Sequence, residues 1–131
     1  MYSKFYPYDE QRWNIQCEKG VQSRVIAYSP EIMMMEWRFF KEGYIVPMHA
    51  HYHAQISYLA RGSAKVTLAD GNIKHCKSGD AVSFAPNEAH SVVIAEPDTV
   101  IIDIFAPVRL DHLENHCLIP DESRPTYEAS P

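Results

Sequence analysis

The sequence contains few cysteines and has no excess of positive charge. Its three cysteines, Cys17, Cys76 and Cys117, are widely spaced and form no Cys-x-x-Cys pair. This spacing argues against a disulfide framework and against a thiolate zinc site, so we expect inert thiols. Twelve Lys and Arg stand against seventeen Asp and Glu, which gives a net charge of −5. Because no basic cluster is present either, we expect no nucleic-acid partner.

Long hydrophobic runs are also missing. No window approaches the length of uncharged apolar sequence that a membrane-spanning helix needs, so we expect no membrane span. The first residues, Met1–Pro7, lack the charged, apolar and small-residue regions of a secretory signal. We therefore expect a cytoplasmic location.

What the sequence does contain is a set of short apolar segments separated by turn residues. Its 131 residues, 46% of them hydrophobic, suffice for one domain with a real core. Nine prolines and five glycines punctuate the segments, which is typical of an all-β sandwich or barrel. We expect a single domain over residues 1–117, one short helix near Leu110–His116, and a tail over residues 118–131 that docks loosely or is disordered. The expected strands are Arg12–Cys17, Val21–Tyr28, Ile32–Phe40, Ala54–Arg61, Ala64–Leu68, Asn72–Cys76, Ala81–Ala85, Ser91–Ile94 and Val100–Phe105.

A run of histidines indicates a metal site. His49 and His51 are two residues apart, and strand side chains alternate between faces, so both rings would project from the same side of an extended strand. Gln55 follows at an even offset, and His90 comes after a Pro-Asn-Glu-Ala turn. Imidazole and amide oxygen suit a divalent transition metal such as Mn, Fe, Ni, Cu or Zn. These neutral donors would leave the full charge on the ion, which favours Lewis-acid chemistry.

Solvated surface histidines are the alternative interpretation, but His49, His51 and His53 fall within five residues, which disfavours it. His53 shares the parity of the first two, and we place it behind the ligands or at the rim of the site.

The segment Val100–Phe105 sets one carboxylate in a continuous apolar strand. By alternation, Ile101, Asp103 and Phe105 share a face, and we expect that face to look into the barrel. An unpaired buried carboxylate is costly, so Asp103 must meet a cation, a hydrogen-bond donor or a proton. The alternative is an outward-facing, solvated Asp103.

The histidine run and the glycines around it resemble a known pattern. From Gly43 to Gly62 the sequence is similar to the first signature of the cupin family, Gly-x5-His-x-His-x3-Glu-x6-Gly, with Gln55 in the place of Glu. The segment Gly79–His90 resembles the second signature. This resemblance implies a jelly-roll barrel, in agreement with the strand pattern.

Residues 12–113 also resemble the KdgF-like group of small single-domain cupins. The resemblance implies an enzyme that linearises 4,5-unsaturated monouronates from pectin or alginate breakdown into open-chain keto sugar acids. It also implies a homodimer, in agreement with the strand Met33–Phe40, which is apolar on both faces. A neighbouring subunit or the N-terminal segment would cover the outer face of that strand. The site residues that the resemblance implies are His49, His51, Gln55 and His90 for the metal, with Asp103, Phe105 and Arg109 completing the site.

These residue types suit that chemistry. Asp103 would move protons as a general acid and base. Arg109 would bind the uronate carboxylate with its planar fork, although a surface ion pair with Asp111 or Glu114 is an alternative. Phe105 would form a wall against the sugar ring. Two other functions remain open: a different metal-dependent cupin enzyme, such as a dioxygenase or lyase, and a non-catalytic sugar- or metal-binding module.

Overall fold

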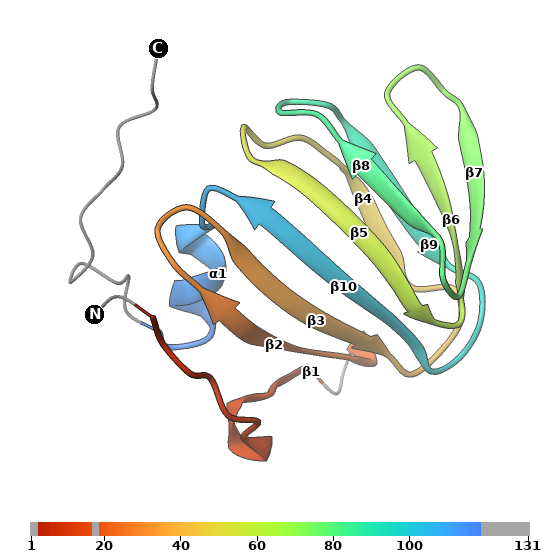
Figure 1. The fold of residues 1–131 in the computed structure, drawn as a ribbon. Coiled ribbons are helices and arrows are strands. Elements are labelled where there is room, and N and C mark those ends of the chain that lie inside the picture. Colours follow the sequence, from red (N-terminus) through yellow and green to blue (C-terminus); the bar gives the residue numbers. More distant parts are fainter. Residues whose placement is uncertain (1–2, 17–18, 119–131) are drawn as a thin grey trace, which may run out of the picture.

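The computed structural model describes residues 3–16 and 19–118, and these form two antiparallel β-sheets that face each other (Figure 1). The six-stranded sheet has the order β1 (Asn14–Gln16), β2 (Val21–Tyr28), β3 (Met33–Phe39), β10 (Thr99–Ala106), β5 (Ala54–Arg61) and β8 (Ala81–Phe84). The four-stranded sheet has the order β4 (Ile45–His49), β9 (His90–Ile94), β6 (Ser63–Leu68) and β7 (Ile73–Lys77). Two short helices, η1 (Glu10–Arg12) and α1 (Leu110–Asn115), complete the described part. The predicted all-β jelly roll is confirmed.

Strand β4 was not expected from the sequence. It carries Pro47 and alternates poorly, with a half-exposed pattern, because it lies at the edge of the four-stranded sheet. Proline is tolerated at such an edge, where its missing N–H does not interrupt a ladder. The expectation of one extended strand through His49 and His51 is wrong: β4 ends at His49, and β5 begins only at Ala54 in the other sheet.

The core lies between the sheets and follows the alternation of the strands. In β10, every second residue from Thr99 to Phe105 is buried, and Asp103 is among them. A second cluster joins Leu113 of α1 to buried residues of β2, β3 and β10 and to Val108. The main cluster consists of Val21, Phe39, Leu59, Ala64, Val66, Cys76, Phe84, Ile94 and Ile101.

The two glycines of the histidine motif adopt backbone conformations that would be strained for other residues. Gly43 (φ +88°) precedes β4, and Gly62 (φ +83°) separates β5 from β6, so both lie in the left-handed region. Gly62 also packs directly against Thr99, and a Cβ atom built on it would overlap the Thr99 side chain. The same atom on Gly43 would meet open space.

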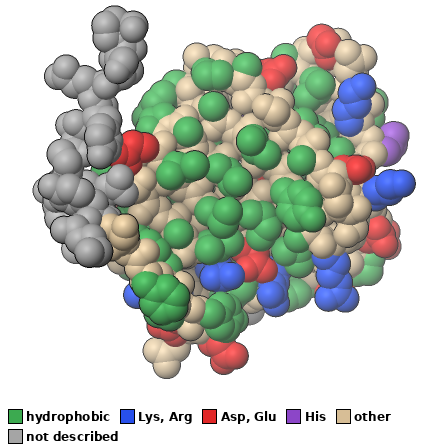
Figure 2. All heavy atoms as spheres, in the orientation of Figure 1, with side chains coloured by type: hydrophobic (Ala, Val, Ile, Leu, Met, Phe, Trp, Pro, Cys, Tyr) green, Lys and Arg blue, Asp and Glu red, His purple; other side chains and the backbone are tan. Residues whose placement is uncertain are grey.

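The outer face of the six-stranded sheet is largely apolar (Figure 2). Met34, Ile56 and Tyr58 are each more than a third exposed there. The N-terminal segment covers only part of this face, where the Trp13 ring lies 4.9 Å from the guanidinium carbon of Arg38. Met34, Ile56 and Tyr58 stay exposed beside the described residues, so within that part of the chain the covering that we expected for the Met33–Phe40 strand is incomplete.

Cys76 is a buried free thiol whose pKa is raised by burial, as an inert thiol requires, and Cys117 is free and exposed. No helix within the described ranges is long and apolar enough to cross a membrane. Cys17 and residues 119–131 lie outside the described residues, so the division into a domain over residues 1–117 and a tail stays a prediction.

Candidate functional site

Three histidines meet where the two sheets approach each other. His49 ends β4 and pairs across the ladder with His90, the first residue of β9, while His51 comes from the connection to β5. The ring centroids of His49 and His90 are 4.5 Å apart, and His51 lies 5.7 Å from His49 and 5.5 Å from His90. One ring nitrogen from each lies within 4.8 Å of the others, so this trio could hold a metal ion.

Backbone carbonyls fix the tautomer of each ring in this trio. The Nδ1 atom of His49 lies 2.8 Å from the carbonyl oxygen of Pro47, and that of His90 lies 2.9 Å from the carbonyl of Glu88. His51 Nδ1 lies 3.0 Å from the carbonyl of His53. A carbonyl oxygen can only accept, so each Nδ1 carries the proton and each Nε2 keeps a free lone pair. The Nε2 atom of His90 is buried and has no hydrogen-bond partner among the described residues.

Gln55, from β5 in the opposite sheet, adds an oxygen to this set. Its Oε1 atom lies 2.9 Å from His51 Nε2. With Nδ1 protonated, these two atoms are both acceptors, so they require a cation or a proton between them. Burial, together with the positive charge of Arg109, lowers the pKa of His51, which disfavours the proton. Three imidazole nitrogens and an amide oxygen therefore fit a divalent transition metal.

His53 lies next to this trio but does not belong to it. Its carbonyl oxygen orients His51, while its buried ring stacks against Tyr52 at a centroid distance of 3.9 Å. The residue contacts the trio through its backbone carbonyl, and its expected place behind the ligands or at the rim of the site stays a prediction.

Asp103 faces the interior of the barrel, as predicted. Ser57 Oγ donates a hydrogen bond to Asp103 Oδ1 at 2.5 Å, and Gln55 Nε2 lies 3.3 Å from the same oxygen. Gln55 Nε2 also donates to Ser57 Oγ at 3.0 Å. Burial raises the pKa of Asp103 to about 6, against the opposing effect of the hydrogen bonds from Ser57 and Gln55. A carboxyl group with this pKa can accept and donate protons near neutral pH.

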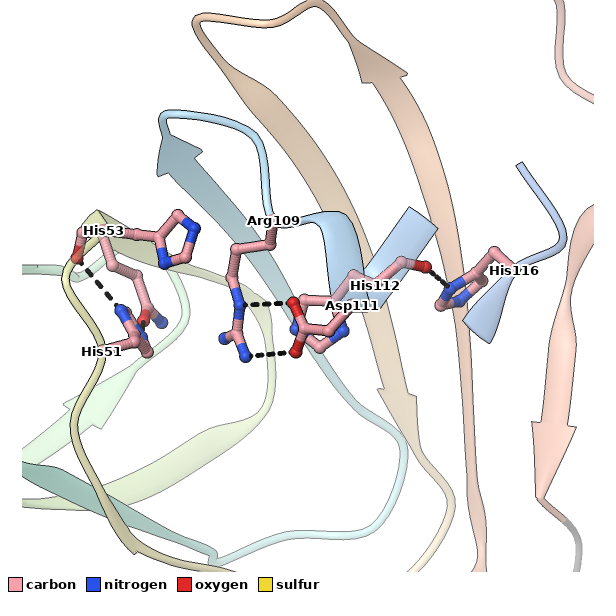
Figure 3. A network of polar contacts seen from close by, with 7 residues as sticks. His51, His53, Arg109, Asp111, His112 and His116 are labelled. Carbon is pink, nitrogen blue, oxygen red and sulfur yellow. Dashed lines mark hydrogen bonds and ion pairs between the residues drawn. The ribbon is translucent and has the colours of Figure 1, made fainter. Parts of the chain in front are cut away.

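Arg109 and Phe105 lie on the helix side of the site. The Arg109 guanidinium carbon lies 5.0 Å from the centre of the Phe105 ring, a cation–π arrangement. Arg109 also forms the ion pair with Asp111 that we considered as an alternative, with an Nη2–Oδ2 distance of 2.8 Å (Figure 3). The Arg109 side chain is only 15% exposed while that of Asp111 is 56% exposed, so the arginine lies at the inner side of this pair.

These groups border one cavity of about 370 Å³. Its size is at the lower end for small-molecule sites, which suits a single sugar ring better than an oligosaccharide. The polar side chains that line it are His49, Gln55, Ser57, His90, Asp103, Arg109 and His112, while the remaining lining residues are largely apolar, among them Trp37, Phe39, Leu59, Val66, Phe84 and Phe105. His51 lies beside this wall, with its ring 5.8 Å from that of Phe105. The structure thus brings all seven residues proposed for the site into one region.

The lining residues that were not proposed as site residues from the sequence include Ser57, His112 and Trp37. Ser57 follows Gln55 by two positions on β5, and strand alternation alone could have placed it on the same face. His112 follows Arg109 by three positions, so helical spacing could have placed both on the same side. Trp37 shares the parity of Met35 and Phe39 on β3, so alternation could have placed it on the inner face, but only the pairing of β3 with β10 brings it close to Asp103.

Comparison with known proteins agrees with this fold. The cupin domain family matches residues 36–105, so the chain belongs to the cupin family. Within that family it is similar to pectin degradation protein KdgF of Dickeya dadantii (strain 3937), with 34% identity over 110 residues that cover 84% of this chain and 98% of the relative.

Solved structures give the same result. The structure of KdgF from Halomonas sp. matches with a TM-score of 0.76 and 33% identity, covering 84% of this chain and all of that one. An RmlC-like cupin from Shewanella frigidimarina NCIMB 400 matches with a TM-score of 0.73 and 29% identity, covering 84% of this chain and 96% of the other. The predicted cupin and KdgF-like resemblance is confirmed.

Proposed function

We propose that the protein is an isomerase that opens and linearises 4,5-unsaturated monouronates from pectin or alginate breakdown into open-chain keto sugar acids. The likeness to a pectin degradation protein supports a sugar-acid substrate. The observation that carries the proposal is the position of Asp103. This buried carboxyl group, with a pKa raised to about 6, lines the same cavity of sugar-ring size as the candidate metal ligands His49, Gln55 and His90 and as Arg109.

The reaction needs one proton removed from the hemiacetal hydroxyl as the ring opens, and one delivered to carbon as the resulting enol becomes a ketone. Asp103 can perform both transfers in turn, because its pKa allows it to accept the first proton and to return a proton to carbon. The net change is an isomerisation, so no oxidant or second substrate is required. Ser57 and Gln55 hold the carboxylate in place by their hydrogen bonds.

Arg109 and Phe105 bind the substrate in this proposal. The guanidinium would form an ion pair with the uronate carboxylate. This pair would replace part of its present interaction with the exposed Asp111. Phe105, under the guanidinium, would contact the apolar face of the sugar. A divalent transition metal bound by His49, His51, Gln55 and His90 would polarise a substrate oxygen as a Lewis acid.

Purified, metal-analysed protein mixed with lyase-generated unsaturated monouronate tests this function. The ultraviolet absorbance of the conjugated double bond should disappear faster than in buffer, and Asp103→Asn should abolish the effect while retaining the metal. Glu114→Gln, which changes an exposed acid of α1, is the matched control and should retain activity. Oxygen uptake with a phenolic substrate and no turnover of the uronate would instead support a dioxygenase.

The metal itself is tested by composition. His90→Ala should reduce the bound divalent metal, measured by mass spectrometry after dialysis, at least tenfold. His75→Ala removes an exposed histidine of β7 and should leave the metal content unchanged. Equal metal content in both variants would contradict the assignment.

We also propose that the protein acts as a homodimer in the cytoplasm. The apolar outer face of the six-stranded sheet, with Met34, Ile56 and Tyr58 exposed, supports the dimer. Light scattering after size exclusion should give twice the chain mass, and Ile56→Glu should give the monomer. Fractionation of the producing cells tests the location.

A further inference from the structure

Beyond the proposed acid and arginine, the cavity contains an unused hydrogen-bond donor. The indole Nε1 of Trp37 is buried and has no hydrogen-bond partner among the described residues. Buried N–H groups are almost always paired, and leaving one unpaired costs free energy. Trp37 also lines the cavity, so a rotation of its buried indole toward a bound molecule would give the N–H the acceptor that the protein does not supply.

The strand register places Trp37 close to the proposed chemistry. On β10, Ile101 pairs with Trp37, while Asp103 pairs with Met35. Trp37 is therefore the diagonal neighbour of Asp103 on the inner face of the sheet, within reach of a long side chain. Ser57 and Gln55 lie on β5, on the other side of β10. A ligand bound at Asp103 would thus have Gln55 on one side and Trp37 on the other.

His112 lies beside Trp37 and also lines the cavity. Its ring forms a T-shaped contact with the indole at a centroid distance of 5.6 Å, and it lies 5.6 Å from the Phe105 ring. Figure 3 shows it next to the Arg109–Asp111 pair. Burial and the charge of Arg109 lower its pKa to about 4, so the ring is neutral near pH 7. A neutral imidazole has one donor and one acceptor, which matches a hydroxyl group.

We propose that Trp37 and His112 form a subsite that binds hydroxyl groups of the sugar-acid substrate, on the side of Asp103 away from Gln55. The inference rests on the proposed function for its substrate class. It assigns two specificity-determining residues that position the sugar, while proton transfer stays with Asp103. A purely structural role for both rings is the competing explanation.

Nuclear magnetic resonance of the unaltered, ¹⁵N-labelled chain loaded with diamagnetic Zn²⁺ distinguishes the two. Only Trp13 and Trp37 contribute indole N–H signals, and Trp13→Phe assigns them. Trp13 donates to Tyr8 Oη at an exposed position, so it serves as an internal control. On saturation with D-galacturonate or the unsaturated monouronate, the Trp37 indole proton should shift downfield while that of Trp13 stays in place. A bound ligand that leaves the Trp37 signal unchanged would overturn the subsite, and so would the absence of binding by both sugar acids.

Kinetics supply a second, independent readout. Trp37→Phe removes the N–H and should raise KM about tenfold with a smaller effect on kcat, the size expected for one lost hydrogen bond. His112→Phe should do the same, while His112→Gln, which keeps hydrogen-bonding groups, should restore much of the affinity. Unchanged KM values in folded Phe variants would overturn the proposal. A Trp37 shift without turnover would keep the subsite and refute the isomerase, whereas turnover without a shift would do the reverse.

Discussion

The side-chain amide of Gln55 connects the histidine trio to Asp103. Its oxygen lies 2.9 Å from His51 Nε2, and its nitrogen lies 3.3 Å from Asp103 Oδ1. An amide can serve both neighbours because it has an acceptor at one end and a donor at the other. A glutamate here would place a second carboxylate against Asp103, which accounts physically for the glutamine in this variant of the cupin signature.

Gln55→Glu should therefore impair the chemistry while preserving the metal. The added negative charge raises the pKa of Asp103 above its present value of about 6, so a larger fraction is protonated near neutral pH. We expect the acidic limb of the kcat/KM profile to move to higher pH and activity near pH 7 to fall roughly tenfold. A profile whose acidic limb does not move would show that this neighbour does not control Asp103.

Ser57→Ala should also raise the pKa of Asp103, but by less than Gln55→Glu. Ser57 donates to the ionised carboxylate and thereby lowers the pKa of Asp103 against the effect of burial. Without that donor, the acidic limb should again move up in pH, with kcat reduced several-fold. Ser83→Ala, at an exposed position of β8, is the matched control and should reproduce the wild-type profile.

Arg109→Lys tests whether the planar fork of the guanidinium is needed. Lysine keeps the charge but loses the two-point contact with a carboxylate, so KM for the uronate should rise about tenfold with little change in kcat. Asp111→Asn weakens the ion pair but leaves the guanidinium intact, and its KM should stay equal or fall. If the asparagine variant lost affinity as strongly as Arg109→Lys, the ion pair itself would be the important element.

The neutral state of His112 predicts a pH-dependent stability. Its folded pKa of about 4 lies below the ordinary value of 6.5, so the unfolded chain binds a proton that the folded protein resists. This penalty is absent near pH 7, appears as pH falls through 6.5, and is complete below pH 4. His112→Gln should thus gain about 2 kcal/mol relative to wild type between about pH 7 and about pH 5. Urea denaturation of both metal-free proteins measures this difference, and a constant gap across pH would contradict it.

Gly62→Ala should destabilise the fold more than Gly43→Ala. Both glycines have positive φ, so either substitution carries a backbone cost of about 1–2 kcal/mol. Only at Gly62 does the new Cβ also collide with Thr99, whose Cα would lie 2.8 Å away. Urea denaturation of the two variants should therefore show a clearly larger loss for Gly62→Ala. Equal losses would mean that the Thr99 contact relaxes without cost.

The sequence predicts which side of a strand a residue faces better than it predicts contacts between segments that are distant in the chain. Alternation alone placed Asp103 and Phe105 on the inner side of β10, and the structure confirms this burial. Alternation failed at His51, because the chain leaves one sheet after His49 and enters the other before Gln55. The residues of the cupin signature nevertheless lie together in the structure, since the resemblance does not depend on how the chain connects them.

The helix side of the site was harder to foresee. Trp37 and His112 are far apart in sequence, and their contact depends on how α1 folds back over the barrel. Neither periodicity nor composition encodes that packing. Local sequence patterns therefore drew attention to Asp103 and the histidine run. They did not reveal that Trp37 and His112 contact each other at the cavity.

The origin of the candidate ligands has a mechanical consequence. His49 and His90 belong to the four-stranded sheet, whereas Gln55 belongs to the six-stranded sheet. A divalent ion bound by residues of both sheets would cross-link them. Loading the protein with metal should therefore slow amide hydrogen exchange in β4 and β5 together. Transient opening of this end of the barrel would then depend on the metal occupancy of the site. The rates at which small molecules enter and leave the cavity would depend on it as well.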